Sequence, residues 1–130
     1  MATNEVFRDA SFVSLPVPVT IKSGDPVRVG VLNAVAQTDA GVAAAGNVPA
    51  IPGGVGNGTG FASVALVGAF RVTVVGALTP GQIVYIKTDN TLTATATGNK
   101  VFGAAIFPKA AGTGPAVVKI LQPGNDTASA

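Results

Sequence analysis

The chain contains no cysteine, no histidine and no tryptophan, and charged residues make up only 11% of its 130 residues. Without cysteine it cannot form disulfides, zinc knuckles or a thiol nucleophile. Without histidine, no side chain has an unperturbed pKa near neutrality, and carboxylates are the usual general bases that remain. Soluble domains carry about 25% charged residues to solvate their surface. Because 48% of this chain is hydrophobic, we expect part of its surface to be buried against other chains in an assembly.

The basic residues are scattered singly along the chain and form no cluster. A nucleic-acid-binding protein would gather them and interleave stacking aromatic residues, so we expect no nucleic acid partner. The uncharged stretch between Asp39 and Arg71 could suggest a membrane span, but Pro49, Pro52 and its many glycines would break a helix there. We therefore expect no membrane partner.

No motif for catalysis or cofactor binding occurs in the sequence. The glycine-rich run 54–60 does not match a phosphate-binding loop, and no helix is predicted to follow it. The serines lack a histidine partner. Asp25 and Asp89 lie in turn contexts, where an Asp side chain commonly accepts local backbone N–H bonds. The sequence therefore predicts no catalytic residue, no cofactor and no metal site, and a protein that is not an enzyme.

Short runs of Val, Thr, Ile and Phe, bounded by Gly, Pro, Asn and Asp, predict an all-β chain. The clearest run, Ser63 to Val74, alternates apolar and polar residues and predicts one long, curved strand with a bend or bulge at Gly68. The other predicted strands are Val27 to Leu32, Ala34 to Thr38, Ile83 to Thr88, Thr91 to Thr95, Val101 to Phe107 and Ala116 to Leu121. Their spacing favours a small single-domain β-barrel or sandwich.

An internal similarity links two parts of the chain. The stretch Gly24 to Val29 recurs 57 positions later as Gly81 to Ile86, and the same register matches Asn33 with Asn90. Each copy predicts a Gly turn, a strand, an Asn-centred turn and a returning strand, so the barrel would consist of two related hairpin units. Chance matching in a chain rich in Gly and Val is the alternative.

The prolines at 16 and 18 cannot donate ladder hydrogen bonds, so Phe12 to Ile21 is predicted to be a sheet edge or an extended arm. This gives an N-terminal arm or edge segment (1–22), a β-barrel-like domain (23–122) and a flexible C-terminal tail (123–130). Within the domain, the Gly- and Pro-rich loop 41–60 is either a flexible surface loop or an ordered loop on a neighbouring subunit.

Several stretches together resemble a family of tailed-bacteriophage capsid decoration (cement) proteins. They are the opening Ala2 to Glu5 with Phe7, then Ser23 to Gly30, Gly68 to Val72, Gly76 to Gln82, Val84 to Ile86, Leu92 to Asn99 and Phe102 to Ile106. The resemblance covers most of the chain, and its motifs are turns and strands. The loop 41–60 is longer and richer in Gly and Pro than the family pattern.

The resemblance implies a structural protein that binds the outer surface of a phage major capsid protein lattice and stabilises the head. It also implies self-association as a homotrimer, and a place on the outer capsid surface of a virion made in the host bacterial cytoplasm. The candidate contacts with the capsid or a neighbouring subunit are Glu5, Phe7, Arg8, Phe12, Leu15, Val48, Ile51 and Val55.

Two hypotheses about these contacts stay open. The segment Glu5 to Ile21 either extends as an arm anchored by Phe7, Phe12 and Leu15, or Phe7 and Phe12 plug the end of the barrel.

The alternative function is a virion surface module that attaches to host-cell glycans or envelope, for which only Tyr85 offers a stacking platform.

Overall fold

The structure, a computed structural model, describes residues 11–42 and 58–122, and in these residues the chain forms strands and no helix. The all-β prediction is therefore confirmed. The strands are β1 (Phe12–Pro16), β2 (Pro26–Val29), β3 (Leu32–Ala36), β4 (Phe61–Ala65), β5 (Ala69–Val75), β6 (Ile83–Ile86), β7 (Leu92–Thr93), β8 (Lys100–Ala105) and β9 (Thr113–Ile120).

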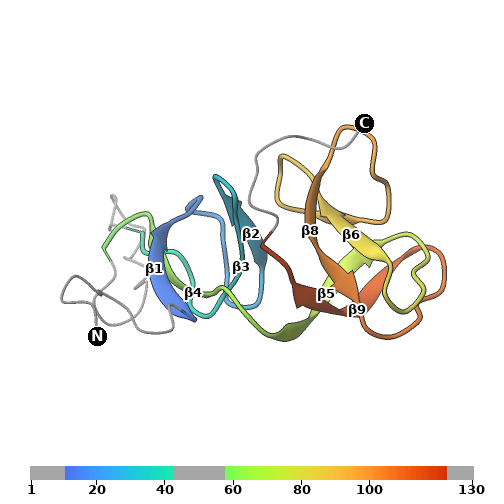
Figure 1. Ribbon diagram of the computed structural model, residues 1–130. Helices are drawn as coiled ribbons and strands as arrows, with labels where there is room; N and C mark the ends of the chain where they lie inside the picture. The colour runs from blue at the N-terminus through green and yellow to red at the C-terminus, as the bar shows by residue number, and fades with distance from the viewer. Residues whose placement is uncertain (1–10, 43–57, 123–130) are drawn as a thin grey trace.

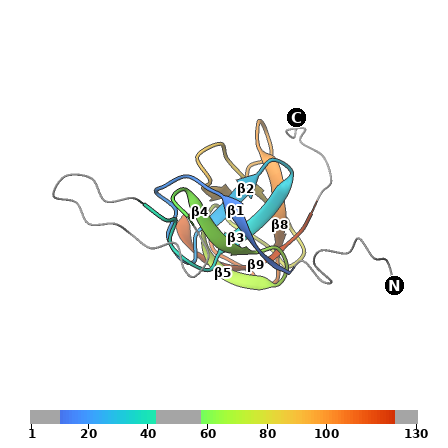
Figure 2. The ribbon, with the colours of Figure 1, turned by 90° about the vertical axis from the view of Figure 1, so that its left-hand side faces the viewer.

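The strands form two sheets that lie beside one another (Figure 1). One is a four-stranded sheet in the order β1-β4-β3-β2, which we call the open sheet. The other runs β5-β7-β6-β8-β9 and closes on itself because β5 pairs with both β7 and β9, so we call it the ring. Viewed along the length of the molecule, the open sheet lies in front of the ring (Figure 2). The chain thus builds two sheets, only one of which closes.

The segment that begins at Phe12 pairs with β4 alone and forms one edge of the open sheet. Pro16 ends this strand, as expected for a residue that lacks an N–H donor. The predicted loop 41–60 starts and ends at a bridge between Gly41 and Thr59. Its residues 43–57, residues 1–10 of the predicted arm and the tail 123–130 lie outside the described residues.

The prediction of one long strand from Ser63 to Val74 is wrong. The chain leaves the open sheet after β4 and enters the ring at β5. Gly68 lies between these strands with a φ of 111°, a left-handed conformation that glycine adopts without steric cost and that redirects the chain. The predicted alternation is nevertheless present, because Val64, Val72 and Val74 are all buried.

The two sheets repeat one pattern of strand pairing. The neighbours β1-β4-β3-β2 of the open sheet correspond to β5-β9-β8-β6 of the ring, all antiparallel. Matching pairs are Phe12↔Ala65 with Ala69↔Lys119, Ala36↔Val64 with Ala105↔Val118, and Val27↔Ala34 with Val84↔Gly103. The strand β7, inserted between β6 and β8 in the chain, has no counterpart in the open sheet.

This pattern agrees with only the first part of the predicted repeat. Gly24 and Gly81, with φ values of 91° and 86°, both precede the matching strands β2 and β6. The match of Asn33 with Asn90 is wrong, because Asn90 lies in a turn with a φ of 65° whereas Asn33 is buried within β3. The returning strand that corresponds to β3 is β8. The relation between the two predicted hairpin units stays a prediction.

Each sheet encloses its own hydrophobic core. The open sheet buries small residues, with alanines at 34, 36, 40 and 62 and valines at 17, 27 and 64. The ring buries larger residues, among them Leu78, Ile86, Leu92, Phe102 and Ile120. Val35 of β3 belongs to the core of the ring, so packing continues from one sheet into the other.

Candidate functional site

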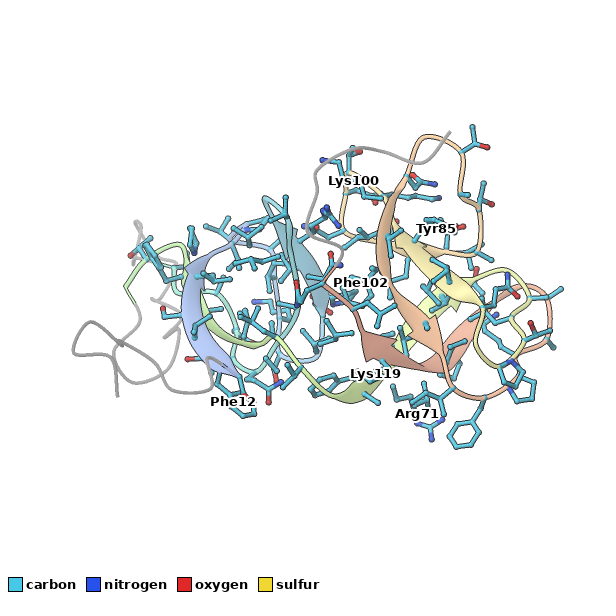
Figure 3. The ribbon with its side chains drawn as sticks, in the orientation of Figure 1. Phe12, Arg71, Tyr85, Lys100, Phe102 and Lys119 are labelled. Carbon is cyan, nitrogen blue, oxygen red and sulfur yellow. The ribbon has the colours of Figure 1, made fainter. Side chains whose placement is uncertain are left out.

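The structure places two of the sequence-predicted contact residues, Phe12 and Leu15, on opposite faces of β1. Phe12 is 64% exposed, and Leu15 packs against the core of the open sheet. The hypothesis that Phe12 plugs a barrel end is therefore wrong, because its ring lies outside the sheet (Figure 3). The other predicted contacts, namely Glu5, Phe7, Arg8, Val48, Ile51 and Val55, lie outside the described residues.

The outer side of β1 and β4 carries no charged side chain. Phe12, Ser14 and Pro16 are exposed along β1, and Ser63 and Phe61 lie directly opposite Ser14 and Pro16 on β4. Residues directly opposite in an antiparallel pair point to the same face, so these five side chains share one surface. We call it the open-sheet face. Phe61 is 40% exposed, so two phenylalanine rings and a proline stand at this surface.

The matching surface of the ring has a different composition. Arg71, Thr73 and Val75 are exposed along β5, opposite Val117, Pro115 and Thr113 of β9. Lys119 continues the outer side of β9, and Ile106 donates its backbone N–H to the carbonyl of Val117. We call these eight residues the ring face. It combines the cations Arg71 and Lys119 with apolar side chains, and Ile106 and Val75 are 40% and 42% exposed.

A lysine holds the loop beside the ring face. The ammonium of Lys109 donates hydrogen bonds to the carbonyls of Gly76, Ala110 and Gly112, at 2.9, 2.9 and 2.6 Å. An ammonium has three N–H donors, and here all three have an acceptor. The loop that carries Ile106 and the 59% exposed Phe107 is therefore tied to β5 and β9 at its base.

A buried asparagine joins the open sheet to the ring. The side-chain amide of Asn33 donates to the carbonyls of Val101, Phe102 and Leu121 at 2.9, 3.1 and 2.7 Å. Its carbonyl oxygen accepts from the Arg28 guanidinium at 3.0 Å, and the side chain is fully buried. Gln122 completes the network, because its side chain bonds both the N–H and the C=O of Asn33. These contacts fix the orientation of the open sheet relative to the ring, and with it the orientation of their outer faces.

Two open hollows lie between the sheets, on either side of Asn90. The smaller, of about 260 Å³, is lined by Arg28, Lys87 and Lys100, and the larger, of about 450 Å³, by Arg71, Asp25 and Asp89. The Arg28 guanidinium donates to the carbonyls of Gly30 and Val101, so hydrogen bonds within the protein hold its charge in place.

Both carboxylates of the larger hollow accept local hydrogen bonds, as the sequence predicts. Asp25 accepts from the backbone N–H of Lys22 at 2.9 Å. Asp89 accepts from the hydroxyl of Thr91 at 2.6 Å and from its backbone N–H at 3.1 Å. These two bonds, the hydroxyl first, lower the pKa of the exposed Asp89 carboxyl. Each Asp therefore stabilises a turn.

Within residues 11–42 and 58–122, no three His, Cys, Asp or Glu side chains gather to hold a metal ion. The same residues include no helix with the length and hydrophobicity to cross a membrane. Tyr85, the only tyrosine of the chain, is half-buried on β6. We take the two exposed sheet faces as the candidate functional site.

Sequence reasoning found part of these faces and missed the rest. The alternation of residues 63–74 places Arg71 and Thr73 on an outer surface, and Phe12 was a predicted contact. The outward residues of β9 were not singled out, although Thr113, Pro115, Val117 and Lys119 alternate with buried positions and carry the period-2 signal of a half-buried strand. The pairing of these strands into one surface is visible only in the fold.

Comparisons with known proteins address the family of the chain. No curated protein and no solved structure matches it significantly. A family model described as phage cement protein matches residues 8–120, which include all nine strands described above. The resemblance found in the sequence is thereby confirmed. A fold whose exposed features are sheet faces agrees with this match, and the chain belongs to the phage cement protein family.

Proposed function

We propose that this cement protein acts by binding the outer surface of the major capsid protein lattice as a homotrimer, with no catalytic role. The family match supports a capsid-stabilising protein. The observation that carries the proposal is the pair of sheet faces, which leave Phe12, Phe61, Ile106 and Val75 between 40% and 64% exposed.

Contact with a shell would bury these side chains. Full burial of one large apolar side chain contributes roughly 1.5 to 3 kcal/mol. A trimer would repeat each contact, and simultaneous engagement of linked sites raises avidity far above the affinity of one site. The sparse charge of the chain also fits a protein that works with much of its surface covered.

The test is cosedimentation of the purified chain with heads that lack it. Expanded shells and unexpanded precursor shells are compared over a range of protein concentrations. We expect saturable binding to expanded shells only, and sedimentation equilibrium of the free chain tests the trimer separately. Protein that stays in the supernatant with both kinds of shell would overturn the proposal.

The predicted arm needs its own variant, since residues 12–16 form a strand of the open sheet. Deletion of residues 1–10 leaves that strand in place, and the matched control deletes the predicted tail, residues 123–130. If the arm anchors the protein, the first deletion releases it from expanded shells and the second does not. Equal retention of both would discard the arm.

A further inference from the structure

We infer that the ring face binds carboxylate side chains on the capsid surface. This inference rests on the proposed function, and it names the surface and the chemistry of the contact. Three observations carry it: the charges on the face, the partners of the carboxylates elsewhere in the structure, and the contrast with the open-sheet face.

The ring face is cationic and has no acidic member. Arg71 lies directly opposite Val117, and Lys119 lies opposite Ala69 on β5 and Ala104 on β8. Both charged side chains are exposed and stand among apolar or hydroxyl residues. Figure 3 shows the Arg71 side chain pointing away from the ring, on the same side of the molecule as Phe12.

The carboxylates of the described residues have other hydrogen-bond partners. Asp25 and Asp89 line the larger hollow together with Arg71, but they accept hydrogen bonds from Lys22 and Thr91 respectively. Asp39 accepts from the backbone N–H of Ser23 at 2.8 Å. Within residues 11–42 and 58–122, the carboxylates thus direct these hydrogen bonds to Lys22, Ser23 and Thr91 and not to the two cations of the ring face.

The same charges select against a second copy of this face as the partner. In a two-fold contact this face would meet its own copy, so the charged residues on both sides would be cations, and like charges across an interface are unfavourable. A surface that offers carboxylates beside apolar side chains complements the ring face in both respects. An arginine also binds a carboxylate through two parallel hydrogen bonds, which fixes orientation.

The open-sheet face shows that strand pairing of this kind does not require a charge at the Arg71 position. The matching residue of β1 is Ser14, which is exposed and uncharged. The residue that matches Lys119 is Ala65, which is fully buried. The exposed cations are therefore a property of the ring face that the open-sheet face does not share.

The experiment measures binding to cement-free expanded heads by cosedimentation. A double variant, Arg71→Glu with Lys119→Glu, is compared with the native chain and with a control, Lys22→Glu with Lys87→Glu. The control makes the same change in net charge at exposed lysines off the ring face. Circular dichroism and sedimentation equilibrium establish that each variant is folded and has the native oligomeric state.

At low salt we expect the ring-face variant to bind at least about tenfold more weakly, and the control to stay within about twofold of the native chain. The difference should shrink at about 0.5 M salt, where charges are screened within a few ångströms. Conversion of shell carboxylates to neutral amides with carbodiimide and glycinamide should weaken native binding by a similar factor. Shells treated without carbodiimide serve as the control.

The outcomes separate this inference from the proposed function. A native chain that fails to bind any shell overturns both. Native binding with equal affinity of both double variants, or with no effect of amidation, overturns the ring-face inference alone. A ring-face variant that changes its oligomeric state also overturns it, because the face would then join copies of this chain. Binding to duplex DNA is measured for the same variants. If the ring-face variant loses binding to DNA but keeps its binding to shells, the partner of the face is phosphate, and the inference is overturned as well.

Discussion

The open sheet and the ring share one strand connectivity but differ in how they end. In the ring, β7 pairs with β5 through Val74↔Leu92 and with β6 through Ile86↔Leu92, and so joins the two outermost strands. In the open sheet, the corresponding strands β1 and β2 stay apart. A two-residue strand inserted in one half is therefore enough to turn a shared arrangement into a closed one.

The comparison also shows how the open half protects its edges. An unpaired strand edge is a template for unwanted pairing, and natural sheets block it with proline or with a covering segment. Pro16 and Pro26 lie in the two edge strands. The backbone N–H of Arg28 donates to the side-chain carbonyl of Asn90, which comes from the ring, at 3.3 Å. The ring thus covers part of an edge that the open sheet cannot close itself.

The cores of the two halves also differ, in the size of the side chains that they bury. The open sheet buries Ala and Val with one isoleucine, Ile21, whereas the ring buries two isoleucines and adds Leu and Phe. Larger buried side chains remove more apolar area from water and stabilise more. The open sheet should therefore depend more strongly on its contacts with the ring, and the following predictions test that dependence from the largest effect to the smallest.

The largest effect is expected for Asn33→Ala. The substitution removes four side-chain hydrogen bonds of Asn33, which are those to the carbonyls of Val101, Phe102 and Leu121 and the one from Arg28. At about 1 kcal/mol for each bond, the loss should lower the free energy of unfolding by about 4 kcal/mol. Denaturant unfolding measures the loss, and hydrogen exchange should show that β1–β4 lose protection before β5–β9.

The matched control for Asn33 is Asn90→Gly, at the position that the sequence paired with it. Asn90 has a φ of 65° in a turn, a conformation that glycine adopts without strain. The change removes one bond to Arg28 and should alter stability by less than about 1 kcal/mol. Equal losses for the two variants would contradict the assignment of Asn33 as the link between the halves.

A smaller effect is expected for Gly103→Ala in β8. A methyl group there would overlap the backbone carbonyl oxygen of Lys119 and lie 2.9 Å from the Cγ1 of Val118. Because the obstacle includes backbone, β8 and β9 must separate, and we expect a loss of about 3 kcal/mol in denaturant unfolding.

The matching position of the open sheet makes the control for Gly103. Ala34 pairs with Val27 as Gly103 pairs with Val84, and its methyl group fits in a buried site. Ala34→Gly should cost about 1 kcal/mol through lost burial and added backbone freedom. If Gly103→Ala has the same free energy of unfolding as the native chain, the ring is no more tightly packed at this position than the open sheet.

The smallest effect concerns the turn that joins β6 to β7. Thr91→Val removes the hydroxyl that bonds Asp89, so the pKa of Asp89 should rise toward its ordinary value. A carboxyl with a lowered folded-state pKa stabilises the fold above its unfolded pKa, and this contribution is lost as the pH falls through the folded pKa. The variant should therefore differ from the native chain above about pH 4 and converge with it at lower pH.

Carboxyl chemical shifts across an NMR titration measure the Asp89 pKa directly. The native chain, titrated under the same conditions, is the reference. An unchanged Asp89 titration would show that the hydroxyl contributes nothing.

Local sequence signals determined the class of the fold. Glycine and proline punctuation with alternating Val, Thr and Ile predicted strands because these residues fix φ and side-chain direction over a few positions. Most predicted strands overlap observed ones, as Ile83 to Thr88 overlaps β6 and Val101 to Phe107 overlaps β8. The low charge and the family motifs were likewise readable from the chain alone.

Only the tertiary structure decided how those strands are arranged and which residues share a surface. Gly68 reads as a bend in a strand, yet it separates two sheets. Asn33 reads as a turn residue, yet carbonyls from β8 and the end of β9 surround it in the interior. Arg71, Val117 and Ile106 meet on the ring face because β5, β8 and β9 pair over long sequence separations. Such pairings depend on packing between distant segments, which short-range propensity does not encode.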